Sequence, residues 1–323
     1  MNLNRRLKRA LKLFLPILLG LALVWYSYNI TSEEDRQQII FYIREADKFW
    51  VGVSVFIGIF SHISRALRWN YLLEPMGYKP RITNNVLIIL MAYFTNLGIP
   101  RSGEFLRATA LATYEGVPFE KGFGTIVTER VVDLVMLLLV VLVALTLQTD
   151  ILLSFLDGRG LSLAGLLVLL TVGVLMLFLF LMFLRRSANR WAIKLKNLIK
   201  GLLDGLMSIF RMKKKWLFLW HTVFIWACYI AMFWVIKYTV PETGSLTIDE
   251  ILVAFVAGAF AMSTTNGGIG LYPIAVSGAL AIYGISDVSG DAFGWIMWIS
   301  QTLMVVVFGA ISFLFLPLLN RNR

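Results

Sequence analysis

The sequence predicts an all-α polytopic membrane protein with about six full transmembrane helices and two oppositely oriented re-entrant helical hairpins. Of its 323 residues, 59% are hydrophobic and 15% charged, a balance typical of chains that use lipid as solvent. Apolar runs of about 20 residues match the roughly 30 Å hydrocarbon core of a bilayer. We therefore expect one integral membrane domain over residues 1–323. The apolar runs are 11–30, 49–73, 84–99, 121–147, 161–184, 216–239, 249–285 and 291–317.

The net charge of +11 is concentrated in a few segments, as in cytoplasmic loops of membrane proteins, and does not indicate nucleic-acid binding. The segment 185–215 carries ten Lys or Arg residues and one acid, so we expect it inside. Its apolar residues recur every three or four positions, which predicts a basic amphipathic helix on the inner surface. The basic tail before residue 13 and the final Arg321 and Arg323 place both termini in the cytoplasm.

These assignments require two segments to enter and leave the membrane by the same face. The stretch 84–115 has both ends inside and is interrupted by Pro100, so it predicts a re-entrant hairpin. The stretch 249–285 dips in from the outside, with a glycine-rich break at 263–270. Residues 49–147 and 216–317 would then form two units of inverted topology, an arrangement found in many transporters.

The polar groups of the first hairpin are the first candidates for a site. Irregular backbone at membrane depth requires surrounding protein or a watery cavity. The helix starting near Gly103 would direct its free amides at that cavity beside Arg101, a suitable seat for a phosphate. We assign substrate binding or translocation to Asn96, Arg101, Glu104 and Arg107 of this hairpin.

The next span opens with Glu129, Arg130 and Asp133, whose spacing places both carboxylates on one helix face. Together with Arg101 and Glu104, these charges would cost on the order of 12–17 kcal/mol if they faced lipid. We therefore expect the five groups to pair around a polar pocket. A structural clamp between the hairpin and the next helix is the alternative explanation.

Two further groups complete the candidate site. Asn266, Gly267 and Gly268 at the second hairpin tip would close the opposite side of the pocket. Arg65 and Arg68 fall at the expected cytoplasmic interface, where they could contact lipid headgroups; snorkelling explains them equally well.

Motifs for known chemistry are absent from the sequence. It contains no P-loop lysine motif, no GxSxG, no HExxH and no cysteine-rich metal spacing. We expect no catalytic residues, no metal and no cofactor. The alternative is a membrane-embedded enzyme or accessory subunit that uses the carboxylates to act on polyprenyl-phosphate-linked sugars. A proton-coupled ion transporter is less favoured, because Arg101 and Arg130 would neutralise a carboxylate relay.

Taken in order, these motifs resemble the transmembrane region of lysylphosphatidylglycerol synthases, also called the flippase-like domain. The resemblance spans about residues 10–317. It rests on Arg65-x-x-Arg68-Trp69, Asn96-x-x-x-Pro100-Arg101-x-Gly103-Glu104-x-x-Arg107, Thr128-Glu129-Arg130-x-x-Asp133 and Gly267-Gly268-Ile269-Gly270.

This resemblance implies a lipid flippase of the cytoplasmic membrane whose partners are phospholipids or polyprenyl-phosphate lipids. The sequence ends at Arg323 without the cytosolic domain of the bifunctional synthases, so aminoacyl transfer is not expected. Further partners left open are a second copy of the chain or a separate lipid-modifying enzyme.

Overall fold

The computed structural model describes residues 18–149 and 212–321, with six isolated positions between these ranges. The expected apolar run at 161–184 and the basic segment at 185–215 therefore lie almost wholly outside the described residues. The chain divides into two compact units: Met1–Ile126 with Lys213–Arg323, called unit 1 here, and Val127–Met212, called unit 2.

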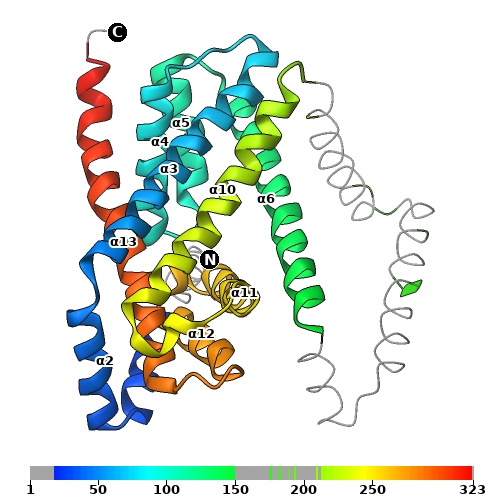
Figure 1. Ribbon diagram of the computed structural model, residues 1–323. Coiled ribbons are helices and arrows are strands. Elements are labelled where there is room, and N and C mark those ends of the chain that lie inside the picture. Colours follow the sequence, from blue (N-terminus) through cyan, green and yellow to red (C-terminus); the bar gives the residue numbers. More distant parts are fainter. Residues whose placement is uncertain are drawn as a thin grey trace. The chain divides into compact units, whose positions relative to one another are not determined.

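The described residues are helical with short connections, which confirms the predicted all-α class. A first apolar helix covers Leu18–Ile30. Figure 1 shows the helices that follow it, whose bounds are α2 Glu33–Glu45, α3 Lys48–Leu73, α4 Ile82–Gly98, α5 Ser102–Glu115, α6 Phe119–Leu147, α10 Lys215–Ile236, α11 Ile248–Thr264, α12 Leu271–Ala281 and α13 Asp287–Leu319. Short 3₁₀ turns lie between them: η1 Glu74–Met76, η2 Lys237–Thr239, η3 Pro241–Ser245 and η4 Asn266–Gly268.

Four helices in the described part of the chain are long and apolar enough to cross a membrane. They cover Lys48–Met76, Phe119–Leu147, Lys215–Thr239 and Asp287–Leu319. The helices between them are shorter: α4 has 17 residues, α5 has 14, α11 has 17 and α12 has 11. At 1.5 Å per residue, the 11 residues of α12 reach only about 16 Å, well short of a hydrocarbon core.

The same order of elements occurs twice. A long helix, α3, is followed by the α4–α5 hairpin and then by α6; a second long helix, α10, is followed by the α11–α12 hairpin and then by α13. Within unit 1, the α4–α5 hairpin occupies the upper part of Figure 1 and the α11–α12 hairpin the lower part. The two hairpins therefore extend from opposite ends of unit 1.

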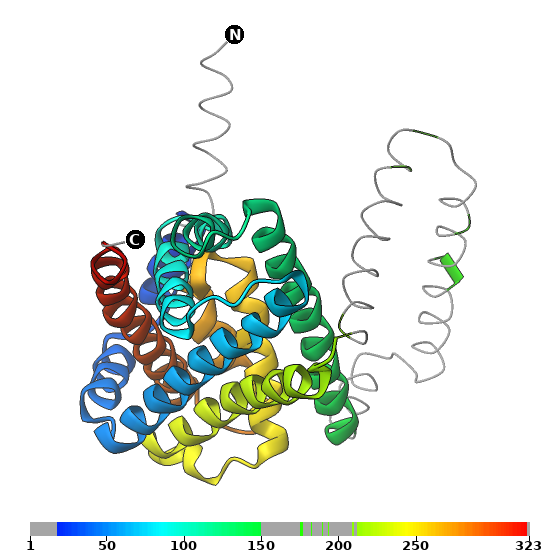
Figure 2. The same cartoon turned by 90° about the horizontal axis from the view of Figure 1, so that it is seen from above.

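The first helices of the two sets, α3 and α10, pack against each other in antiparallel orientation. Figure 2 shows them side by side along much of their length. Ser54, near the start of α3, donates to the carbonyl of Met232 near the end of α10 at 3.3 Å. Further along, Ser64 Oγ lies 2.8 Å from His221 Nδ1 near the start of α10. Polar side chains thus line this interface along its length.

Helix α13 packs against α4 and α12, one helix of each hairpin. Gly309 lets it approach α4 closely, since a Cβ there would lie 2.3 Å from Phe94 Cβ. Gly58 likewise allows α3 to approach α13 closely, because a Cβ on Gly58 would lie 3.0 Å from Met304 Sδ in α13. Small residues at crossings are how helices in membranes gain van der Waals contact.

Candidate functional site

The tips of the two hairpins meet inside unit 1. Asn266 Nδ2 in η4 donates a 2.7 Å hydrogen bond to the carbonyl oxygen of Leu97 at the end of α4. A Cβ added to Gly267 would lie 3.4 Å from Leu97 Cδ2, in ordinary van der Waals contact. Asn266 is only 4% exposed. The two breaks predicted from sequence are therefore adjacent in space, at the place where hairpins from opposite ends come together.

The break in the first hairpin is built by three consecutive residues. α4 ends at Gly98, Ile99 is extended, and Pro100 cannot supply the amide that would continue the helix. Arg101 then adopts a left-handed conformation, φ +61°, and among the described residues it is the one non-glycine with positive φ. Such a conformation costs about 1–2 kcal/mol for a residue with a Cβ. The exposed Arg101 side chain is thus held at the tip by a strained backbone.

Asn96 joins the two legs of the first hairpin, and its predicted role in substrate binding stays a prediction. Its Oδ1 accepts a 2.7 Å hydrogen bond from the backbone N–H of Gly103, in the first turn of α5. The N–H of Ser102 is also used, since it donates to the Ile99 carbonyl at 3.2 Å. Two of the amides expected to face a ligand are therefore satisfied within the hairpin. Asn96 acts as a cap that joins the two legs.

Gly103 allows the two legs to approach closely. A Cβ at this position would lie 2.2 Å from the carbonyl oxygen of Ala92. One turn further along α5, Arg107 is 3% exposed, and its guanidinium lies 4.1 Å from the ring centroid of Trp69. Trp69 in turn donates from Nε1 to Thr125 Oγ1 at 2.8 Å. Arg107 is thus packed inside unit 1 through a cation–π contact.

The second tip uses glycines where the first uses an arginine. Gly267, Gly268 and Gly270 all have positive φ, which explains the glycine-rich sequence at this position. Trp298 of α13 donates from its indole Nε1 to the Gly267 carbonyl at 2.7 Å. The sequence did not predict a role for Trp298, because nothing in an apolar run indicates which backbone carbonyl the indole N–H of a tryptophan will contact.

Arg65 and Arg68 lie in the α3–α10 interface. They are 2% and 0% exposed. Arg65 donates to Tyr229 Oη at 2.9 Å, and Arg68 to Thr222 Oγ1 at 3.3 Å. Inside unit 1 they join two helices, and their predicted contact with lipid headgroups stays a prediction.

Glu129, Arg130 and Asp133 belong to unit 2. Arg130 Nη1 lies 3.9 Å from Asp133 Oδ2, an i,i+3 ion pair on α6. Glu129 is buried. The expected pairing of these three residues with Arg101 and Glu104 stays a prediction. Glu104 itself lies in the first turn of α5 and is half-buried.

The fold and these contacts define a class of protein. The protein is a polytopic α-helical membrane protein in which two hairpins from opposite ends of one unit meet at polar, irregular tips. The chain belongs to the family described as the lysylphosphatidylglycerol synthase TM region, whose profile matches residues 13–320. This match confirms the resemblance that the sequence motifs indicated.

Two curated relatives match shorter stretches. The UPF0104 membrane protein MJ1595 of Methanocaldococcus jannaschii is 31% identical over 87 residues, which is 26% of this chain and 26% of the relative. The glycosyltransferase AglD of Haloferax volcanii is 29% identical over 101 residues, which is 31% of this chain and 16% of the relative. The matched stretches thus span about a quarter and a sixth of these relatives' lengths. No solved structure matches the chain.

Proposed function

We propose that this protein is a flippase-like translocator that moves an anionic or lipid-linked headgroup across the cytoplasmic membrane. The observation that supports this most directly is the contact between the hairpin tips, Asn266 with the Leu97 carbonyl. In transporters built from inverted repeats, broken helices that meet near the midplane form the substrate site. Parting of these tips would open a polar path between the two sides, and their contact would close it.

The proposed membrane placement follows from charge at the two ends of unit 1. The end with the base of the α4–α5 hairpin carries Lys79, Arg81, Lys121, Lys213, Lys214, Lys215 and Arg321 against Glu74, Glu115 and Glu120. The opposite end carries Glu33, Glu34, Asp35, Glu45, Asp47, Glu242, Asp249, Glu250 and Asp287 against Arg36, Arg44, Lys48 and Lys237. The positive-inside bias favours the first end as cytoplasmic, with both hairpins re-entrant from opposite faces and both termini inside.

The headgroup chemistry is proposed from the groups at the tips. Arg101 is an exposed guanidinium at the start of α5, and a guanidinium suits a phosphate oxygen because it donates charge-assisted hydrogen bonds. Glu104, in the first turn of the same helix, would meet a cationic or hydroxyl part of the headgroup. Acyl chains would stay in lipid, because only the polar head requires a path through protein.

A reconstituted translocation assay tests this function. Purified protein in liposomes with headgroup-labelled phospholipids should remove label from one leaflet, and Arg101→Ala should slow this on the order of tenfold, as expected when a charge-assisted contact is lost. Arg44→Ala is the matched control, since Arg44 is an exposed arginine in α2, away from the tips. Native rates for folded Arg101→Ala would remove Arg101 from the mechanism. Absence of movement for every lipid tested would contradict the function itself.

A second function is favoured by one comparison. The match to a glycosyltransferase over 101 residues supports a protein that acts on, or assists an enzyme acting on, polyprenyl-phosphate-linked sugars. In that case a second copy of the chain or a separate lipid-modifying enzyme would be its partner. Sugar transfer in proteoliposomes that requires a divalent cation and is abolished by Asp133→Asn would support this function in place of the first.

A further inference from the structure

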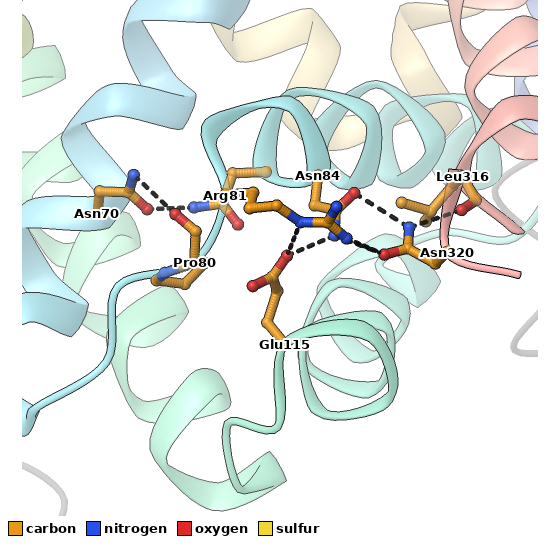
Figure 3. Close-up of polar contacts among 8 residues, drawn as sticks. Asn70, Pro80, Arg81, Asn84, Glu115, Leu316 and Asn320 are labelled. Atoms are coloured by element: carbon orange, nitrogen blue, oxygen red, sulfur yellow. Dashed lines mark hydrogen bonds and ion pairs between the residues drawn. The ribbon is translucent and has the colours of Figure 1, made fainter. Parts of the chain in front are cut away.

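Four polar side chains join three helix ends at the base of the α4–α5 hairpin (Figure 3). Asn84 and Asn320 exchange two hydrogen bonds through their amides, at 3.0 and 3.1 Å. Asn84 Nδ2 also donates to Glu115 Oε1, and Arg81 donates to Asn320 Oδ1. Arg81 Nε lies 3.4 Å from Glu115 Oε1, completing an ion pair. We call Arg81, Asn84, Glu115 and Asn320 the base cluster.

The four members of the base cluster come from three helix ends. Arg81 is the N-cap of α4 and Asn84 lies in its first turn, Glu115 is the last residue of α5, and Asn320 is the C-cap of α13. Asn320 is also fixed to its own helix, because its Nδ2 donates to the Leu316 carbonyl at 2.7 Å. The cluster therefore fastens both legs of one hairpin to the end of a third helix.

The cluster is largely buried. Asn84 is 1% exposed, Asn320 is 8% exposed, and the Glu115 side chain is 6% exposed, whereas the Arg81 side chain is 43% exposed. Burying amides and a carboxylate is favourable only while their hydrogen bonds are made. Since Asn84 and Asn320 share partners with Arg81 and Glu115, loss of one side chain removes several of these hydrogen bonds together. Such a network is expected to form and break as one unit.

We infer that the base cluster is a latch that holds the two legs of the α4–α5 hairpin to α13 and releases both together. α13 also holds the tip of the other hairpin, through Trp298 and the Gly267 carbonyl. The latch therefore connects the base of the first hairpin to the helix that supports the tip of the second. Opening it frees the first hairpin to move while α13 keeps its hold on the other tip. This inference goes beyond the proposed function and holds whichever substrate the protein carries.

Hydrogen exchange of the full-length protein in lipid nanodiscs tests the latch without any measurement of translocation. Asn320→Ala removes the α13 member. We expect backbone exchange to accelerate about tenfold in both hairpin legs, over 82–90 and 108–116, because the hydrogen bonds of Asn320 to Asn84 and Arg81 are lost together. Amides at the tip, 97–104, should keep their native rates. Acceleration limited to the end of α13 would overturn the latch.

Glu115→Gln provides a second variant that keeps the side-chain shape and removes the charge. It should accelerate exchange in α4 and at the end of α13, although the substitution lies in α5. Glu120→Gln is the matched control, because Glu120 is an exposed glutamate five positions further along. Equal exchange in Glu115→Gln, Glu120→Gln and the unmodified protein would show that the three helix ends are held independently.

Discussion

The side-chain amide of Asn266 donates to the backbone carbonyl of Leu97 at 2.7 Å, although the two residues are 169 positions apart. This bond connects the hairpin that extends from one end of unit 1 with the hairpin that extends from the other. The acceptor lies at the end of α4, where the carbonyls of the last turn have no helical partner. Asn266 thus satisfies an open helix end and joins the two halves of the fold.

Asn266→Ala should destabilise the protein by about 1–3 kcal/mol, because it removes a buried hydrogen bond and leaves the Leu97 carbonyl without this donor. The midpoint of unfolding in detergent measures the change. Asn29→Ala is the control, since the Asn29 side chain is exposed and bonds only to Trp25 of its own helix turn among the contacts described. Equal midpoints for the two variants would contradict the importance of the tip contact.

Gly103→Ala and Gly98→Ala form a matched pair on either side of the first break. A Cβ on Gly103 would lie 2.2 Å from the Ala92 carbonyl oxygen, whereas a Cβ on Gly98 would meet nothing within 4 Å. We expect Gly103→Ala to lower the free energy of unfolding by about 1–3 kcal/mol through overpacking. Gly98→Ala should be neutral or slightly stabilising, because alanine favours the helix. Thermal unfolding of both proteins checks the difference; a harmless Gly103→Ala would show that the legs are not closely packed.

Substitution can separate the backbone conformation of Arg101 from the charge of its side chain. Its left-handed backbone predicts that Arg101→Gly is more stable than Arg101→Ala by about 1 kcal/mol, because glycine adopts this conformation without strain. Both variants should translocate labelled lipid equally slowly, since both lack the guanidinium. Unfolding midpoints and proteoliposome rates measured on the same preparations test this. Recovery of transport in Arg101→Gly alone would assign the role of Arg101 to backbone geometry.

The hydrogen bonds of Glu242, at the end of unit 1 opposite the base of the α4–α5 hairpin, should make the stability of the fold depend on pH. Its carboxylate accepts hydrogen bonds from Ser286 Oγ at 2.5 Å and from Ser286 N at 3.0 Å. These bonds hold the pKa of Glu242 below its ordinary value. A depressed folded-state pKa means that the carboxylate stabilises the fold above the ordinary glutamate pKa, and that this contribution is lost as pH falls through the lowered value.

The melting temperature of the unmodified protein should therefore exceed that of Glu242→Gln at neutral pH, and the difference should shrink as the pH falls below the ordinary glutamate pKa and through the lowered one. The effect is expected to be small, because Glu242 is exposed and solvent screens its interactions. Glu120→Gln serves as the control for general acid destabilisation. A difference that grows as the pH falls would mean that Glu242 is not stabilised as the carboxylate.

The sequence could predict the helix class and the two breaks because their signals are local. Pro100 and the glycines at 267, 268 and 270 carry a backbone requirement wherever they occur. The partners across the fold could not be predicted in the same way. An apolar helix has no polar face that shows which side will pack, so the burial of Arg65 and Arg68 against α10 is set by tertiary contacts.

The base cluster could not be predicted from the sequence either, because some of its members are far apart along the chain. Asn84 and Asn320 are 236 positions apart and neither lies in a recognisable motif. Asn96 is an intermediate case. Its occurrence before the break predicted a polar role, and only the folded hairpin assigns its Oδ1 to the Gly103 amide.

Reversible cross-linking of the two tips tests the central claim most directly. Leu97→Cys and Gly267→Cys, combined with Cys228→Ser to remove the native thiol, place two thiols where the Leu97 side chain and a Cβ on residue 267 would be in contact. If headgroups pass where the tips part, cross-linked protein in liposomes should stop moving labelled lipid, and reduction should restore the rate. Equal translocation by the cross-linked and reduced protein would contradict the account.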